Sequence, residues 1–129
     1  MSDAVSSMMA QDVASRSLGI DVVSSGVGEA VTQMTVRADM VNGHGIAHGA
    51  FLFAVADTAF ACACNSHGPV TVAAGADITF VAPVHAGDVL QAHAVERTRW
   101  GRSGIYDVAI TRAGEVVAEF RGLSRTVAQ

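Results

Sequence analysis

A chain of 129 residues is long enough to bury the core of one domain and too short for two, so the sequence predicts a single domain over residues 1–129. Half of the residues are hydrophobic and no repeat or low-complexity tract is visible, which excludes a disordered chain and a solenoid. The net charge of −4 argues against a general nucleic-acid-binding protein. No signal-like N-terminus and no membrane-spanning apolar run is present, so we expect a cytoplasmic protein without a membrane partner.

The N-terminal extension, residues 1–17, is expected to contain one helix over 4–17, because apolar side chains recur there every three or four residues. Residues 19–37 predict a hairpin of two strands about a Ser-Ser-Gly turn at 24–26. Strong helix formers without Pro or Gly fill residues 50–65. Apolar groups lie all round this helix, so it is expected to be buried on nearly every side.

The remaining residues predict four strands, over 69–84, 87–100, 103–112 and 115–128. In the last strand Val116, Ala118 and Phe120 are expected to share one face. An antiparallel sheet curled around one central helix, an α+β architecture, is the economical way to bury these elements. Cys62 and Cys64 diverge on that helix, so both are expected to be small core residues rather than a disulfide.

Asp57 is the only charged residue in this apolar helix. No Lys or Arg occurs between Arg37 and Arg97, so a local ion pair is excluded. Burying an unpaired carboxylate is costly, and perturbed carboxylates are concentrated in active sites. Asp57 is therefore a candidate catalytic residue with a pKa raised by desolvation, and a structurally satisfied or capping Asp is the alternative.

The glycine-rich loop before the helix is the second candidate feature. Its glycines allow close backbone approach, and the start of the helix exposes N–H groups at the positive end of the helix dipole. The Gly49 amide could stabilise an oxyanion, with Asn42, His44 and His48 as further donors, although an ordinary capped turn is the alternative. The two histidines are four residues apart in an irregular loop and have no third ligand at a suitable spacing, so no metal site is predicted.

The spacing of Gly49 and Asp57 has a consequence for assembly. Eight helical residues span about 12 Å, whereas groups that act on one carbonyl lie within about 3 Å of the reacting atoms. If both residues act together, two chains must contribute, and a twofold dimer would bring Gly49 beside the partner subunit's Asp57.

The segment NGHGIAHGAFLFAVADTAFA resembles the central-helix motif of the hotdog-fold acyl-CoA thioesterases of the phenylacetate-degradation (PaaI-type) group. That motif is an Asn, a His-Gly-Gly, and an Asp eight residues after the first of these glycines. ADITFVAPVHAGDVLQAHAVERTRWGRSGIYDVAITRAGEVVAEFRG resembles the remaining strands of the same fold, so the resemblance covers residues 15–125. It implies a hotdog fold, with the sheet wrapped around one long helix, and a homodimer with interfacial sites, paired into a dimer of dimers.

The resemblance also implies roles for the motif residues. The Gly49 amide would polarise a thioester carbonyl, and the partner subunit's Asp57 would attack it or activate water. Asn42 would position the thioester or the water, and His48 would orient the loop. Ala50 replaces the second glycine and is expected to tighten the acyl pocket. The candidate coenzyme A contacts near RWGRSG are Arg102, with Arg97 or Arg99, and Ser103 and Gly104.

The arginine content agrees with an anionic ligand. Residues 97–129 carry six arginines against three acidic residues, whereas residues 1–96 carry two against nine. Arginine can donate two hydrogen bonds at once to a phosphate, although a solvated strand face would have the same composition. The pattern permits a bound phosphate group without requiring one.

The implied function is hydrolysis of phenylacetyl- or hydroxyphenylacetyl-CoA, or of related thioesters, to the free acid and coenzyme A. No cofactor is expected, because coenzyme A is part of the substrate. A thioester needs an oxyanion site and a base or nucleophile, and a thiolate leaves without strong acid assistance. Two alternatives are a hotdog dehydratase or hydratase that uses His44 or His48 with Asp57, and a non-catalytic acyl-CoA-binding module. The sequence fixes neither the preferred acyl group nor the choice between nucleophile and base.

Overall fold

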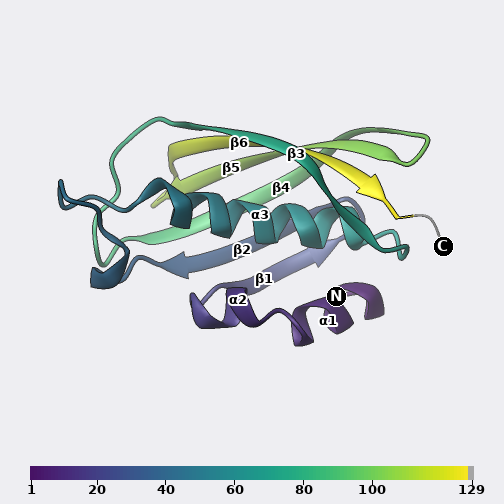
Figure 1. Ribbon diagram of the computed structural model, residues 1–129, viewed down its shortest axis with the longest axis horizontal. Helices are drawn as coiled ribbons and strands as arrows, with labels where there is room; N and C mark the ends of the chain where they lie inside the picture. The colour runs from purple at the N-terminus through teal and green to yellow at the C-terminus, as the bar shows by residue number, and fades with distance from the viewer. Residues whose placement is uncertain (128–129) are drawn as a thin grey trace.

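The computed structural model describes residues 1–127 and contains one antiparallel sheet of six strands with one long helix against it (Figure 1). The helices are α1 (Asp3–Ala10), α2 (Val13–Ser17) and α3 (Gly49–Asn65), with a short 3-10 turn at Ala38–Met40. The strands are β1 (Asp21–Gly26), β2 (Glu29–Thr35), β3 (Thr71–Phe80), β4 (Val89–Trp100), β5 (Ser103–Arg112) and β6 (Glu115–Thr126). They lie in the order β1-β2-β4-β5-β6-β3, so β1 and β3 form the two edges.

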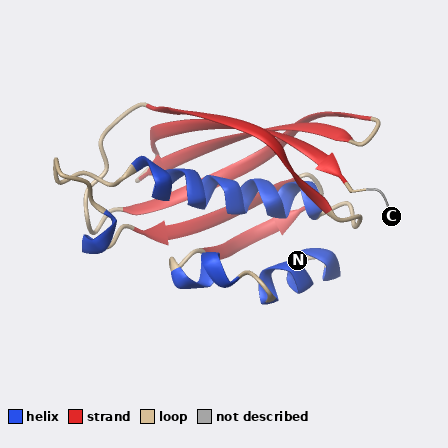
Figure 2. Cartoon of the chain, in the orientation of Figure 1, coloured by secondary structure: helices blue, strands red, loops and turns tan. Residues whose placement is uncertain are grey.

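Helix α3 packs along one face of the sheet, with β3 on one side of it and α1 and α2 on the other (Figures 1 and 2). Val55, Ala59 and Phe60 on its sheet-facing side are at most 1% exposed and lie in the core. The opposite side of the helix is only half-buried and includes Asp57. The expectation of burial on nearly every side is therefore wrong for the single chain, in which only the face toward the sheet is fully buried.

Cys62 and Cys64 are both buried and free, as the sequence predicts. Burial raises the pKa of the Cys62 thiol to about 11 and that of the Cys64 thiol to about 12. Both thiols therefore stay protonated at neutral pH and pack as small apolar groups.

The N-terminal extension differs from the single helix predicted over 4–17. Asp12 has ψ of 88°, which interrupts the helix, and its carboxylate then caps the new helix α2 by accepting a hydrogen bond from Ser15 N–H. Val13 is 70% exposed and does not contribute to the apolar face. The extension thus folds as two short helices beside β1.

Two further predictions are wrong in detail. The first hairpin turns at Val27 and Gly28 instead of 24–26, because Gly28 supplies the left-handed φ of +72° that the turn needs. In β6 a register shift opposite Ile110 and Thr111 inserts an extra residue, so Val117 is buried and Val116 is 37% exposed. Val116 therefore does not share the inner face of Ala118.

The edge strand β3 carries several exposed apolar side chains. Val72 is 49% exposed and Phe80 is 53% exposed, and Val81, which follows the strand, is 58% exposed. An edge strand with unpaired backbone groups and apolar side chains is a ready template for pairing with another strand.

No helix among residues 1–127 is both long and apolar enough to cross a membrane.

Candidate active site

The loop before α3 is organised by Asn42. Its side-chain oxygen accepts hydrogen bonds from His44 N–H at 2.9 Å and Ile46 N–H at 3.3 Å, and its backbone N–H donates to Ile46 O at 2.7 Å. Gly45 closes this turn with φ of +77°, which favours glycine. The Asn42 Nδ2 group has no protein partner among residues 1–127, so it is free to donate to a ligand.

His48 caps the start of α3. Its Nδ1 accepts the Ala50 N–H at 3.3 Å, and its own N–H donates to Met40 O at 2.7 Å. Phe51 N–H donates to His48 O, and the Gly49 N–H makes no hydrogen bond with the described residues. This donor lies at the positive end of a 17-residue helix, where developing negative charge is stabilised.

Asn42 and Gly49 line the same cavity, which has a volume of about 360 Å³. Its other walls are apolar and come from the loop before α3, the first turn of α3, the end of β3 and the segment that follows β3: Ile46, Ala47, Leu52, Phe80, Val81, Ala82, Pro83 and Val84. Ala50 is exposed and does not line this cavity. The structure thus brings together an apolar chamber and two polar donors.

Asp57 lies two turns further along α3 and faces a different cavity, of about 150 Å³. Its carboxylate makes no hydrogen bond or ion pair with any residue in 1–127. Burial, and secondarily the negative charge of Asp12 across this cavity, raise the pKa of Asp57. The upward direction agrees with the sequence prediction, and Asp57 and Gly49 of one chain line different cavities.

The N-terminal extension forms the other wall of the Asp57 cavity. Asp12 accepts hydrogen bonds from Ser15 N–H at 2.9 Å and from Ser15 Oγ at 2.6 Å, and Ser15 Oγ lies 2.8 Å from Thr58 Oγ1. This chain of contacts ties α2 to α3 at the residue next to Asp57. Sequence reasoning missed Asp12, although an Asp directly before an apolar residue such as Val13 is a recognisable N-cap signal.

The RWGRSG segment borders a narrow cleft at the far end of α3, lined in part by Arg99, Arg102 and Ser103. Arg102 is exposed and has no carboxylate within 4 Å among the described residues. Gly104 is buried, and a methyl group there would lie 2.9 Å from Ser124 Oγ. Arg102 is therefore the arginine of this segment whose charge is free, whereas Gly104 serves packing.

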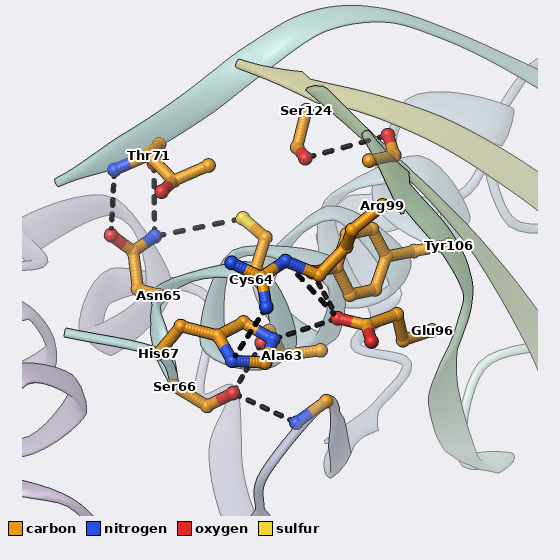
Figure 3. Close-up of polar contacts among 12 residues, drawn as sticks. Ala63, Cys64, Asn65, Ser66, His67, Thr71, Glu96, Arg99, Tyr106 and Ser124 are labelled. Carbon is orange, nitrogen blue, oxygen red and sulfur yellow. Dashed lines mark hydrogen bonds and ion pairs between the residues drawn. The ribbon is translucent and has the colours of Figure 1, made fainter. Parts of the chain in front are cut away.

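Arg99 is held within a polar network that the sequence did not predict (Figure 3). Arg99 donates to His67 Nδ1 at 3.2 Å, and His67 Nε2 lies 2.7 Å from Glu96 Oε1, which also accepts the Tyr106 hydroxyl at 2.8 Å. Burial opposes ionisation of Glu96, but the hydrogen bonds from His67 and Tyr106 outweigh it and hold the pKa of this carboxyl below its ordinary value. Arg97 is likewise paired, with Asp107 at 3.6 Å.

Within residues 1–127, no group of three or more metal-ligating side chains is arranged to hold a metal ion.

Comparison with known proteins places this architecture in a family. Residues 44–119 match the thioesterase superfamily. The chain is 46% identical to the acyl-coenzyme A thioesterase PaaI of Escherichia coli (strain K12), over 93% of this chain and 86% of that protein. The structure of the E. coli PaaI protein from the phenylacetic acid degradation operon matches with a TM-score of 0.94 and 44% identity, covering 97% of this chain and 91% of that chain. The TT0310 protein from Thermus thermophilus matches with a TM-score of 0.88 and 40% identity, covering 91% of this chain and 99% of that chain.

A six-stranded antiparallel sheet packed on one long helix, in a chain with these matches, is the hotdog fold, and the chain belongs to the thioesterase superfamily. Within the superfamily it belongs to the PaaI-type acyl-CoA thioesterases, and it is accordingly an enzyme, a thioester hydrolase. The fold and the family predicted from the sequence are thus confirmed.

Proposed function

We propose that this enzyme hydrolyses an arylacetyl-CoA, either phenylacetyl- or hydroxyphenylacetyl-CoA, or a related thioester, to the free acid and coenzyme A. The observation that carries the proposal is that α3 carries two groups without a protein partner among the described residues: the Gly49 N–H, which lies at an apolar cavity, and the Asp57 carboxylate. The arylacetyl group is supported by the E. coli relative, which comes from a phenylacetic acid degradation operon.

The chemistry needs two groups. The Gly49 N–H donates to the thioester oxygen and stabilises the negative charge that develops there, with Asn42 Nδ2 as a second donor to the thioester or the water. A carboxylate then attacks the carbonyl carbon directly or removes a proton from the attacking water. The thiolate of coenzyme A leaves without strong acid assistance, so the reaction requires no further cofactor.

The carboxylate in each site is the partner subunit's Asp57. Support for a shared site comes from the distance of about 12 Å along α3 between Gly49 and Asp57 of one chain. Support for a dimer comes from β3, whose open edge and exposed Val72 fit pairing with a second copy of the same strand. Association of two such dimers into a tetramer is part of the same proposal.

The phosphates of coenzyme A are proposed to lie against Arg102. Arg97 and Arg99 are already engaged by Asp107 and by Glu96, so binding a phosphate would require them to leave those partners. Arg102 keeps its donors free, and Ser103 beside it adds a hydroxyl. Arg99 borders the same cleft and contributes a secondary positive charge.

The test is release of thiol from phenylacetyl-CoA and from a few other aryl and medium-chain acyl-CoAs, by the wild type and by Asp57→Asn. Activity is expected to fall roughly a hundredfold or more in Asp57→Asn. The matched control is Asp21→Asn, which removes the same charge from an exposed position on β1 and is expected to leave the activity unchanged.

The variants must first be shown to have the same circular dichroism spectrum and oligomeric state. Full activity in Asp57→Asn would make this carboxylate structural and overturn the proposed mechanism. Absence of thiol release from every thioester tested would overturn the substrate assignment. Turnover of an enoyl- or 3-hydroxyacyl-CoA without thiol release would then indicate a dehydratase, and tight binding without turnover a binding module.

A further inference from the structure

Phe80 packs directly against the catalytic glycine. A methyl group placed on Gly49 would lie 2.5 Å from Cζ of Phe80 and 3.0 and 3.1 Å from the two Cε atoms. Real side chains essentially never approach so closely, so the ring occupies the space that a side chain at residue 49 would need. Phe80 ends β3, whereas Gly49 begins α3, so this contact joins two elements across the cavity.

The contact depends on the absence of a side chain at residue 49. Gly49 is the first residue of α3 and is not among the glycines with positive φ, so its backbone conformation is open to any residue. A side chain there would have to displace the ring of Phe80. Because the side chain is absent, a ligand carbonyl can approach the Gly49 N–H closely while the ring covers one side of it.

Phe80 also borders the space that the acyl group needs. The ring lines the 360 Å³ cavity together with Gly49 and apolar residues such as Leu52 and Val84. A dry apolar cavity of about 150 Å³ already accepts a benzene ring, so this one has room for an aromatic acyl group and more. The ring remains 53% exposed and therefore has a free face to offer a ligand.

We propose that Phe80 is a specificity-determining residue, whose ring forms the wall against which the acyl group of the bound thioester packs when its carbonyl accepts from Gly49 N–H. The inference rests on the proposed function and extends it to acyl selection. A flat aromatic wall favours a compact aromatic acyl group by stacking and limits the space for a long alkyl chain.

The test compares kcat/KM for phenylacetyl-CoA and decanoyl-CoA in the wild type, Phe80→Leu and Phe80→Ala. The ratio of decanoyl-CoA to phenylacetyl-CoA activity is expected to rise about tenfold in Phe80→Ala, with a smaller rise in Phe80→Leu. Val23→Ala is the matched control, because Val23 has the same exposed fraction, 53%, but lies on β1 at the opposite edge of the sheet. Its ratio is expected to equal that of the wild type.

A second measurement does not depend on catalysis. Gly49→Ala is expected to lower the thermal midpoint, and the loss is expected to be smaller in a Phe80→Ala background, where the colliding ring is absent. Equal losses in both backgrounds would overturn the packing argument. An unchanged substrate ratio in folded Phe80→Ala, or an equal loss with both substrates, would overturn the specificity role while leaving the thioesterase function in place. A wild type that releases no thiol from any thioester would overturn the proposed function and this inference with it.

Discussion

At the residue scale, the carboxylate of Asp57 is expected to cost the folded protein stability. Burial and the nearby charge of Asp12 raise its pKa, so the folded state disfavours the ionised form relative to the unfolded chain. The stability that the Asp57 carboxyl contributes through its raised pKa is present when the group is protonated, below its ordinary pKa of about 4. It is lost as pH rises through the raised pKa. Asp57→Asn is therefore expected to be more stable than the wild type at neutral pH, with a higher Tm.

The measurement is thermal unfolding of both proteins between pH 4 and pH 8. The stability gain is expected to shrink toward zero at the acidic end, whereas the exposed Asp21→Asn control is expected to show little change at any pH. A variant less stable than the wild type at pH 8 would mean that the Asp57 carboxylate has a stabilising partner in the assembled protein, contrary to this account.

The second residue-scale prediction concerns Asp12. Asp12→Asn keeps a capping oxygen for α2 but removes the charge that helps raise the pKa of Asp57. The acidic limb of the kcat/KM profile is therefore expected to move to lower pH. Ser15→Ala breaks the contact with Thr58 without changing charge. The acidic limb of its kcat/KM profile is expected to stay at the wild-type pH. Identical shifts in both variants would indicate a structural effect of α2.

At the element scale, Gly122 of β6 leaves the space in which Phe60 of α3 packs. A methyl group on Gly122 would lie 2.7 Å from Cζ of Phe60, whose ring is 1% exposed and packs against the rings of Tyr106 and Phe120 at 5.5 and 5.8 Å. The ring has no space to retreat, so Gly122→Ala is expected to destabilise the protein by about 1–3 kcal/mol, measured by urea unfolding. Gly26→Ala, where nothing lies within 4 Å, is expected to stay within about 0.5 kcal/mol of the wild type. Similar losses in the two variants would refute the packing argument.

The elements that the sequence predicted best are those with a strong local signal. The bounds of α3 and β5 were predicted to within a residue, because glycine or a turn bracketed a run of uniform propensity. The bulge that buries Val117 was not predictable, because it depends on register with β5. The break at Asp12 was missed because apolar spacing alone was taken to continue the helix.

At the scale of the whole molecule, the candidate site was predictable only in part. The loop chemistry of Asn42 and Gly49 is local and could be inferred from the glycine-rich motif before a helix. The end of β3 lines the Gly49 cavity and α2 lines the Asp57 cavity, and both pack on α3 only after folding, so nothing in the sequence tied Phe80 or Asp12 to the site. The inference that two chains share each site followed from helix geometry and is open to direct test.

That test is complementation between two inactive variants. Asn42→Asp keeps the side-chain oxygen that accepts the His44 and Ile46 N–H groups, but it removes the Nδ2 donor and adds a charge that repels the oxyanion. Asp57→Asn removes the carboxylate. Each homodimer is expected to be nearly inactive. In a mixed dimer, one site combines the intact Asn42 loop of one subunit with the partner subunit's Asp57.

Random mixing makes half of the dimers mixed, each with one intact site of two, so co-refolded protein is expected to regain about a quarter of the wild-type specific activity. Because the rescue requires subunit exchange, mixing the two folded homodimers briefly is expected to restore less than co-refolding does. If each site belonged to one chain, every site in the mixture would carry one defect. The activity would then never exceed the average of the two variants, and this result would contradict the shared site.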